Sequence, residues 1–411
     1  MSALRVGVVG AGTGGPATAL LLARAGHAVE LFEAAPDPGP IGAGILLQPT
    51  GMGVLEELGL LEPVLAAGER IERVLGVTTG GRSVLDLSYG DLEPGLFGLG
   101  LHRGALFDVL WRAVKEAGVP VHCGAQIARM AGGRLVEADG ERHGPYDLIV
   151  LADGARSRLR ARSGIPARVR RYPWGALWAI LEDPGGEWDR ALWQVYRGTA
   201  AMLGFLPLGR PAAVAGERRL VSLFWSLRVD DDWRARGLEA WKREVCALDA
   251  RAEALLEQID DPAQLLFAAY HDVRMPRWHG DGVALVGDAA HAMSPQLGQG
   301  VNLALLDAHA LARCIGATGH LPSALAAYSE ARRRNVRFYA WASRLLTPFF
   351  QSGHEVLAAP RDLLTGPLSR IPWYRRQMLE SLAGVKTGVW STLEDAEPTL
   401  RSPRSATRGS P

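Results

Sequence analysis

Asp288, Gly298 and Gly300 are residue types that suit the binding of a flat ligand linked to a sugar. Asp288 follows an apolar, strand-like segment, 282–287, so its carboxylate is expected at the carboxyl end of a strand, where it can accept hydrogen bonds from sugar hydroxyls. The two glycines lack a Cβ atom and let the backbone lie close to a flat ring. Alanines and leucines recur at helical spacing over 301–314, so the partly positive amide end of that helix points at the ring and favours a ring that becomes anionic.

A second glycine-rich loop stands near the N-terminus, between a strand-like segment, 4–9, and a helix-like segment, 15–25. In its Gly-x-Gly-x-x-Gly pattern the first glycine suits a tight turn, the second admits a pyrophosphate, and the third allows close packing of helix on strand. The loop residues expected at a dinucleotide are Gly10, Gly12, Thr13, Gly14 and Gly15. Glu33 ends the next strand-like segment, where a carboxylate binds adenosine ribose hydroxyls and disfavours a 2′-phosphate. The pattern predicts FAD or NAD rather than NADP as the resident dinucleotide.

Three stretches together resemble the signatures of the single-component FAD-dependent aromatic hydroxylases, the para-hydroxybenzoate hydroxylase-like family. The first is the N-terminal glycine loop, and the second is 153–160, which matches the family's Asp-Gly motif from Asp153 to Arg160. The third matches the family's Gly-Asp motif at Gly287, Asp288, Ala289, His291, Pro295, Gly298, Gln299, Gly300, Asn302 and Asp307. Arg103 also lies in a segment similar to the family's His-Arg-x-x-Leu helix, whose arginine follows the FAD pyrophosphate and ribityl chain.

The resemblance implies an α/β fold with a Rossmann-like FAD-binding domain, a mixed β-sheet substrate domain and a C-terminal helical segment. The expected boundaries are 1–75, 98–171 and 276–345 for the FAD-binding domain, 76–97 and 172–275 for the substrate domain, and 346–398 for the helical segment. Residues 399–411 are polar and proline-rich, which predicts a disordered tail.

The resemblance also implies an NAD(P)H-consuming monooxygenase that inserts one atom of O2 into an aromatic or polycyclic small molecule through a C4a-hydroperoxyflavin. FAD would be bound non-covalently, and NADPH or NADH would be a transient co-substrate. Besides the first loop and Glu33, the residues implied at the cofactor are Arg103, Asp153, Asp288, Pro295, Gly298, Gly300, Val301 and Asn302. Pro295 and Gly298 would flank the reacting edge of the ring. The family's loop arginine, which is associated with a mobile flavin, is missing between Glu33 and Arg70.

Tryptophans and strand-like segments concentrate between residues 172 and 273, where a sheet is expected to form one wall of the substrate pocket. The residues expected nearest the substrate are Trp193, Met202, Phe205 and Trp225. Tyr196 and Arg197 are the nearby polar candidates for steering or deprotonating a phenol. An arginine-rich stretch, 156–171, fits either a solvated face or a docking site for the phosphates of NAD(P)H.

The composition restricts the other partners. A net charge of +1 over 411 residues favours neither nucleic acid nor an anionic membrane, and no apolar run reaches the roughly 18 residues of a spanning helix. The three cysteines are scattered without metal-type spacing, which predicts buried free thiols in a reducing cytoplasm and no metal site. The expected partners are thus a small aromatic substrate and O2, with the chain a monomer or homodimer.

Two other flavoprotein activities remain open on the sequence alone. A flavin-dependent halogenase would share the fold but carries a Trp-x-Trp-x-Ile-Pro motif, which the nearest segment, 174–178, does not match. An isoprenoid cyclase or a geranylgeranyl-type reductase would share the fold without consuming oxygen. Substrate-dependent oxygen uptake with NAD(P)H oxidation would separate a cyclase or reductase of this kind from a monooxygenase.

Overall fold

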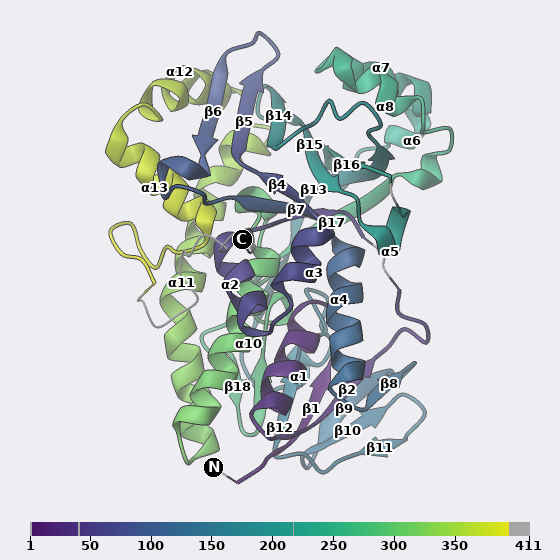
Figure 1. Ribbon diagram of the computed structural model, residues 1–411, viewed down its shortest axis with the longest axis vertical. Helices are drawn as coiled ribbons and strands as arrows, with labels where there is room; N and C mark the ends of the chain where they lie inside the picture. The colour runs from purple at the N-terminus through teal and green to yellow at the C-terminus, as the bar shows by residue number, and fades with distance from the viewer. Residues whose placement is uncertain (1, 40–41, 217, 394–411) are drawn as a thin grey trace, which may run out of the picture.

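The computed structural model describes residues 2–39, 42–216 and 218–393. Its lower half in Figure 1 is built on a six-stranded sheet with the order β18-β19-β12-β1-β2-β8. The strands are β1 (Arg5–Val9), β2 (Ala28–Glu33), β8 (Val121–Cys123), β12 (Leu148–Leu151), β18 (His279–Gly280) and β19 (Val283–Leu285). Every neighbouring pair is parallel except β18–β19. This order, with β1 at the centre, is Rossmann-like and confirms the predicted fold class.

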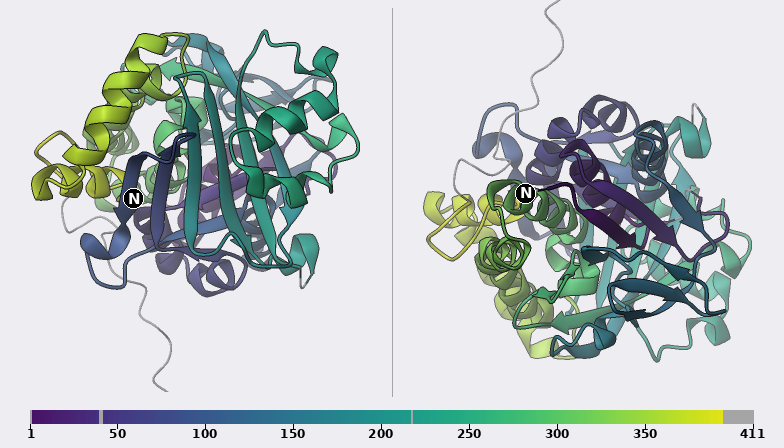
Figure 2. Two further views of the ribbon diagram at one scale, coloured as in Figure 1. Left: turned by 90° about the horizontal axis from the view of Figure 1, so that it is seen from above. Right: turned by 90° about the horizontal axis from the view of Figure 1, so that it is seen from below.

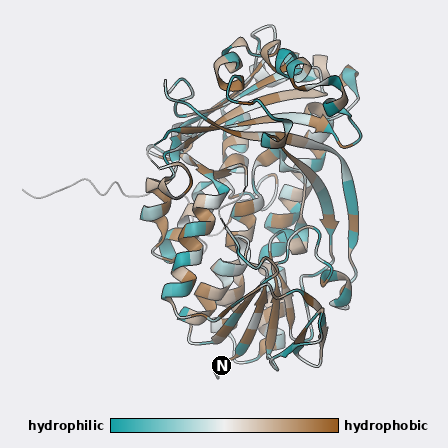
Figure 3. Cartoon of the chain, turned by 90° about the vertical axis from the view of Figure 1, so that its right-hand side faces the viewer, coloured by the Kyte–Doolittle hydropathy of each residue, from teal (hydrophilic) through white to brown (hydrophobic). Residues whose placement is uncertain are grey.

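Both faces of this sheet are covered, which explains the continuous apolar sequences of β1 and β12. Figure 3 shows these lower strands as mostly hydrophobic. The helices of this half are α1 (Gly14–Arg24), α2 (Pro49–Glu57), α3 (Leu61–Ala66), α4 (Arg103–Glu116), α9 (Asp288–His291), α10 (Gly300–Ala317) and α11 (Leu321–Phe350). Helix α1 packs between β1, α4 and α10, and these elements share one hydrophobic core.

A small antiparallel sheet covers the other face of the Rossmann-like sheet. It consists of β9 (Ile127–Ala131), β10 (Arg134–Glu137) and β11 (Arg142–His143). Leu135 of this sheet and the adjacent Tyr146 pack so closely on β1 that a Cβ atom at Gly7 would lie 2.9 Å from the Tyr146 ring. This sheet was not expected from the sequence, because its strands are only two to five residues long.

The upper half of Figure 1 contains a seven-stranded mixed sheet, in the order β17-β13-β16-β15-β14-β5-β6. Its strands are β5 (Arg73–Thr78), β6 (Ser83–Ser88), β13 (Arg168–Glu182), β14 (Ala191–Arg197), β15 (Ala201–Gly209), β16 (Leu220–Arg228) and β17 (Leu266–Arg274). Strands β5 and β6 join this sheet through the parallel pair β14–β5. A three-stranded sheet of β3 (Gly44–Leu47), β7 (Gly98–His102) and β4 (Glu69–Ile71) connects the two halves.

Short helices cover the outer face of the seven-stranded sheet: α6 (Trp233–Arg236), α7 (Leu238–Cys246) and α8 (Glu253–Leu256). A fourth short helix, α5 (Ala212–Ala215), connects β15 to β16. Gly237, with φ of 83°, separates α6 from α7. Left-handed backbone is accessible to glycine without strain, so the chain turns there.

The C-terminal part lies along one side of both halves (Figures 1 and 2). Helix α11 runs for 30 residues and crosses the boundary expected at residue 345, with Pro348 in its last turn. Helices α12 (Ala358–Leu368) and α13 (Pro372–Ala383) follow and contact β6. The predicted tail, 399–411, lies outside the described residues. Within the described residues, every helix is too short or too polar to cross a bilayer.

Candidate functional site

The predicted cofactor residues converge at one edge of the Rossmann-like sheet. Strand β1 ends just before Gly10, β2 ends at Glu33, and β12 ends just before Asp153. Asp288 follows β19, which is also parallel to these strands. Because the carboxyl ends of parallel strands share an edge, the four segments lie side by side at the position where such sheets bind dinucleotides.

The first glycine loop has the geometry that its pattern predicts. Gly10 has φ of +104°, and a Cβ atom on Gly15 would lie 1.8 Å from the Gly10 carbonyl oxygen. Around Gly12, by contrast, no described atom lies within 4 Å of an added Cβ. The loop is therefore packed against the strand at its ends and open in the middle, where a phosphate would approach the first turn of α1.

The Glu33 carboxylate lies over this loop. Its two oxygens accept hydrogen bonds from the amides of Ala11, at 2.8 Å, and Ala35, at 2.9 Å. A carboxylate has about four acceptor positions, so capacity remains for ribose hydroxyls.

Asp153 provides a further acceptor at the same edge. Its Oδ1 atom is buried without a hydrogen-bond partner among the described residues. Burial raises the pKa of Asp153, an effect that Ser157 and Arg160 partly oppose. Buried polar atoms in proteins are nearly always hydrogen-bonded, and a dinucleotide bound at this edge would supply the missing donor.

Arg160 joins the Asp-Gly motif to the Gly-Asp motif. Its buried guanidinium donates to the carbonyl oxygens of Ala289, at 3.0 Å, and Ala155, at 2.9 Å. One side chain thus bridges the two motifs, in addition to the pairing of β12 with β19 that precedes them.

Asp288 and Arg103 are charged and exposed. Within the described part of the chain neither side chain has a hydrogen bond or ion pair. Asp288 lies beside the start of α10, since its Oδ1 atom would be 3.9 Å from a Cβ on Gly300. Arg103 is the first residue of α4, and its side chain passes over Gly42, where an added Cβ would be 3.0 Å away. Both side chains are available to a ligand.

A buried ionic network supports the Gly-Asp motif from behind. Asp307 Oδ2 accepts from the Gly287 amide, at 2.8 Å, and contacts His291 Nε2 at 2.6 Å. Its Oδ1 accepts from Nε of Arg332 at 2.8 Å, and both of these side chains are fully buried. Burial alone would raise the pKa of Asp307, but His291 and Arg332 outweigh burial and lower it. The sequence matched Asp307 to the family without giving it this role.

Residues 294–300, called here the ring loop, precede α10. Gly298 adopts left-handed backbone, with φ of 61° and ψ of 28°, and no described atom lies within 4 Å of an added Cβ. Pro295 and Gly300 are exposed, and α10 begins at Gly300, so the amides of its first turn, including that of Val301, face the loop side. The backbone of this loop is therefore uncovered at Gly298.

Asn302 has a different surrounding from the one expected. Its side chain is buried; Oδ1 accepts from the Gln48 amide at 2.8 Å, and Nδ2 donates to the carbonyl oxygens of Gly298, at 3.2 Å, and Leu46, at 3.4 Å. The side chain therefore connects the ring loop to the end of β3. Only its backbone amide remains for a cofactor.

Three of the four expected pocket residues point away from the Rossmann-like half. Phe205 and Trp225 are buried in the core formed with α6, α7 and α8, and Trp193 packs against that core. Trp193 donates from Nε1 to Asp249 at 2.9 Å, and Phe205 stacks on Trp188 with ring centres 3.9 Å apart. Alternation along a strand assigns these side chains to one face, and that face is the outer one. Their assignment to the substrate pocket is therefore wrong.

The opposite, inner face carries Met202, Trp178 and Phe224. Met202 alternates with the outer residues along β15, and Phe224 lies next to Trp178 with ring centres 5.1 Å apart. Ser222, two residues from Phe224, accepts a hydrogen bond from the Gly44 amide at 3.2 Å, which places this face toward the Rossmann-like half. The sequence showed that side chains alternate between the two faces of these strands, but it gave no signal as to which face is the inner one.

The two polar candidates are separated. Tyr196 is buried, donates to Gln194 Oε1 at 2.9 Å and packs on Phe350 and Arg361. Burial raises the pKa of Tyr196, which disfavours its phenolate. Arg197 is exposed and points to the other face of β14. The structure thus does not bring this pair together as an acid–base unit.

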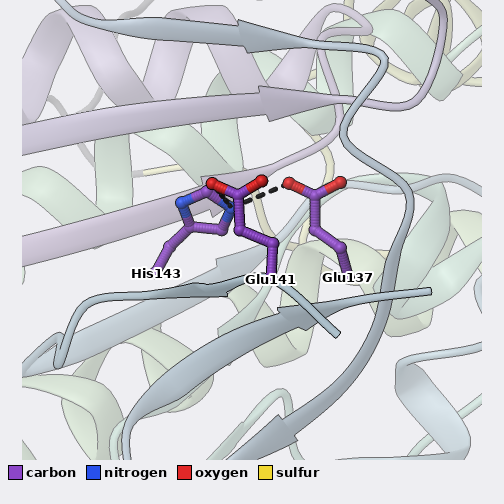
Figure 4. Close-up of side chains that lie close together, drawn as sticks. All are labelled: Glu137, Glu141 and His143. Atoms are coloured by element: carbon purple, nitrogen blue, oxygen red, sulfur yellow. Dashed lines mark hydrogen bonds and ion pairs between the residues drawn. The ribbon is translucent and has the colours of Figure 1, made fainter. Parts of the chain in front are cut away.

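Figure 4 shows a group of metal-ligand type on the small antiparallel sheet, formed by Glu137, Glu141 and His143. His143 Nε2 lies 2.7 Å from Glu137 and 3.9 Å from Glu141. One imidazole nitrogen faces both carboxylates, as in a hydrogen-bonded His–Glu pair, and we assign no metal to this group. None of the three cysteines forms a disulfide, and Cys123 is exposed, contrary to the expectation that all three are buried.

Comparison with known proteins identifies the family of the chain. Residues 3–340 match the family model described as FAD binding domain. Salicylate hydroxylase of Pseudomonas putida is 32% identical over 407 residues, covering 90% of this chain and 92% of the relative. Aurachin C monooxygenase/isomerase of Stigmatella aurantiaca is 30% identical over 340 residues, covering 80% of this chain and 85% of the relative. The solved tetrameric form of 2-methyl-3-hydroxypyridine-5-carboxylic acid oxygenase has a TM-score of 0.76 at 25% identity, covering 93% of this chain and 96% of the solved chain. The chain therefore belongs to the FAD-dependent aromatic hydroxylases and is an FAD-dependent monooxygenase.

Proposed function

We propose that FAD lies along the carboxyl edge of the Rossmann-like sheet, with its adenosine end at Glu33 and its ring at the ring loop. The pyrophosphate would lie at Gly12 and the N-terminus of α1, with Arg103 as its cation, because the loop is open there and the guanidinium is exposed. Asp288 would accept hydrogen bonds from the hydroxyls near the ring. Bound FAD supplies the redox and oxygen-activating chemistry, and the chain binds, orients and shields it.

The ring face is proposed to lie on Gly298 and Gly300. At this position the first-turn amides of α10 stabilise negative charge on the ring. The buried Asp307 network keeps this motif fixed from the protein side, and Pro295 would border the edge at which oxygen is transferred.

The proposed substrate is an aromatic or polycyclic small molecule held between the ring and the inner face of the seven-stranded sheet. Trp178, Met202 and Phe224 provide an apolar wall there, as ligand sites usually have. The names of the similar proteins, among them a hydroxylase of salicylate and an oxygenase of a hydroxypyridine carboxylate, support hydroxylated aromatic acids and heteroaromatics as the first compounds to test.

NADPH or NADH is proposed as the electron donor, docking near Arg156 and Arg171. Both guanidiniums are exposed, and after burial they are the main causes that lower the pKa of His271, an effect that Asp288 opposes. Arg171 is also the strand partner of His271 in the β13–β17 pair, and this shared neighbourhood with Asp288 supports nicotinamide docking near the proposed flavin edge over a purely solvated face. Arg171→Ala is expected to raise KM for the nicotinamide while leaving FAD binding unchanged.

The observation that carries the proposal is the convergence of four strand ends with an open glycine loop and an exposed ring loop. The test is a panel of phenols, aromatic acids and polycyclic polyketides, read by NAD(P)H oxidation, oxygen uptake and product mass. A product heavier by one oxygen atom supports it. Reduction of the substrate, or turnover without oxygen uptake, would favour a reductase or cyclase instead.

Assembly and location are further proposals. We propose a monomer or homodimer in the cytoplasm, on the basis of the near-neutral charge and the absence of disulfides among the three cysteines. Light scattering of the FAD-loaded protein would measure the assembly.

A further inference from the structure

All three polar side chains of the ring loop are bonded to the C-terminal part of the chain. Ser294 Oγ pairs with Thr347 Oγ1 at 2.9 Å, Gln296 Nε2 donates to Gln351 Oε1 at 2.8 Å, and Gln299 Nε2 donates to the Leu382 carbonyl oxygen at 2.8 Å. The remaining loop residues are proline, leucine and glycine. The loop that faces the proposed flavin ring is thus held by α11 and α13 through its side chains.

Gln351 extends one of these contacts to the substrate sheet. It directly follows the last residue of α11, is 2% exposed, and donates from Nε2 to the Gly175 carbonyl oxygen of β13 at 3.2 Å. Its backbone carbonyl accepts from the Tyr172 hydroxyl at 3.3 Å, and its amide donates to Thr347 at 2.8 Å. Every polar group of Gln351 is therefore used, and turning its side-chain amide alone would place donor against donor and acceptor against acceptor.

Gly175 lies on the strand that carries Trp178 of the inner face, at the end of an irregular stretch of β13 between Arg171 and Gly175. One side chain thus joins the ring loop to the strand that borders the proposed pocket. Buried polar groups of this kind fix geometry strongly, because a displaced group would lose its partner in a dry surrounding.

We propose that Gln351 is a positioning residue that sets the ring loop relative to the substrate sheet, and thereby aligns the flavin edge with the bound aromatic. This inference rests on the proposed function for the ring and pocket positions.

The test compares Gln351→Leu and Gln296→Leu with Thr199→Val as the matched control. The first two are called here the relay variants, because each removes the hydrogen bond between Gln296 of the ring loop and Gln351. Thr199 is fully buried and donates to the Ser352 carbonyl oxygen at 3.0 Å, so the control removes a similar bond next to Gln351 without touching the ring loop. Hydrogen exchange of residues 294–300 is followed by mass spectrometry in the FAD-loaded proteins. We expect exchange about fivefold faster in both relay variants, as loss of one net hydrogen bond implies, and unchanged in the control.

The second readout is the fraction of oxidised NAD(P)H that yields hydroxylated product rather than hydrogen peroxide, measured with the panel compound that the wild type hydroxylates. It should fall several-fold in both relay variants at unchanged FAD content. If residues 294–300 exchange as slowly in the relay variants as in Thr199→Val, the claim that Gln351 holds the ring loop in place is wrong. If exchange is faster but the fraction of oxidised NAD(P)H that yields hydroxylated product is unchanged, the hydrogen bond stabilises the loop without aligning the flavin, and the positioning role is wrong.

The exchange result does not depend on turnover, so failure of the proposed reaction would be seen separately, as absence of product in the wild type. If Gln351→Leu does not fold, Gln296→Leu keeps the test, since Gln296 is only partly buried.

Discussion

Replacing Asp288 by alanine tests the proposed contact to FAD without disturbing the protein itself. The side chain is exposed, and within the described residues it has neither a hydrogen bond nor an ion pair, so its removal should leave the stability of the apoprotein unchanged. Any effect on FAD affinity then reports a contact with FAD. A hydrogen bond to a charged group contributes roughly 1.5–3 kcal/mol. The dissociation constant for FAD should therefore rise about tenfold to a hundredfold at 25 °C.

The assay is titration of apoprotein with FAD, followed by quenching of flavin fluorescence, with the thermal midpoint of each apoprotein measured alongside. Asp281→Ala is the matched control, because Asp281 is an exposed aspartate at the opposite end of β19. An Asp288→Ala variant that binds FAD within about threefold of the wild type would refute the assignment, since that change lies below the energy of one charged hydrogen bond.

Three further predictions concern other parts of the site. Arg103→Ala should weaken FAD binding about tenfold or more in the same titration, while Arg112→Ala, a change on the exposed part of the same helix, should not; equal affinities would leave Arg103 as a surface residue. Gly298→Val forces a branched residue into left-handed backbone, and it should retain FAD but divert NAD(P)H oxidation to hydrogen peroxide; wild-type coupling would place the ring elsewhere. The pKa of Asp307 is lowered in the fold, so its stabilising contribution should be complete above its unfolded pKa of about 3.9 and be lost as the pH falls below that value. Thermal midpoints of wild type and Asp307→Asn across pH 3 to pH 6, a range of about three pH units around that value, should show this acid-sensitive component in the wild type only, and parallel profiles would contradict it.

The cofactor half of the fold was predictable because its constraints are local. Gly10 and Gly15 stand at fixed spacing around a turn, and the structure shows the close contact that only glycine permits there. Asp288 follows an apolar strand, so its place at the sheet edge follows from the order of elements.

The substrate half was less predictable because strand alternation defines two faces without ranking them. Phe205 and Met202 belong to opposite faces of β15, and only the packing of α7 on the Phe205 side decides which face is outer. Contacts between distant segments were also hidden: Gln351 and Gln296 are ordinary polar residues in the sequence, and their pairing follows from the path of α11. The β9–β11 sheet was missed for a similar reason, because its strands are stabilised by packing on β1 rather than by apolar alternation.

The most direct test of the account is turnover under isotopically labelled O2 with NAD(P)H and the aromatic panel. A monooxygenase transfers one atom of O2 to the substrate and the other to water, so the product should carry a single labelled oxygen and form only in the FAD-loaded protein. A product oxygen that comes from solvent, or an altered substrate formed without O2, would contradict the account.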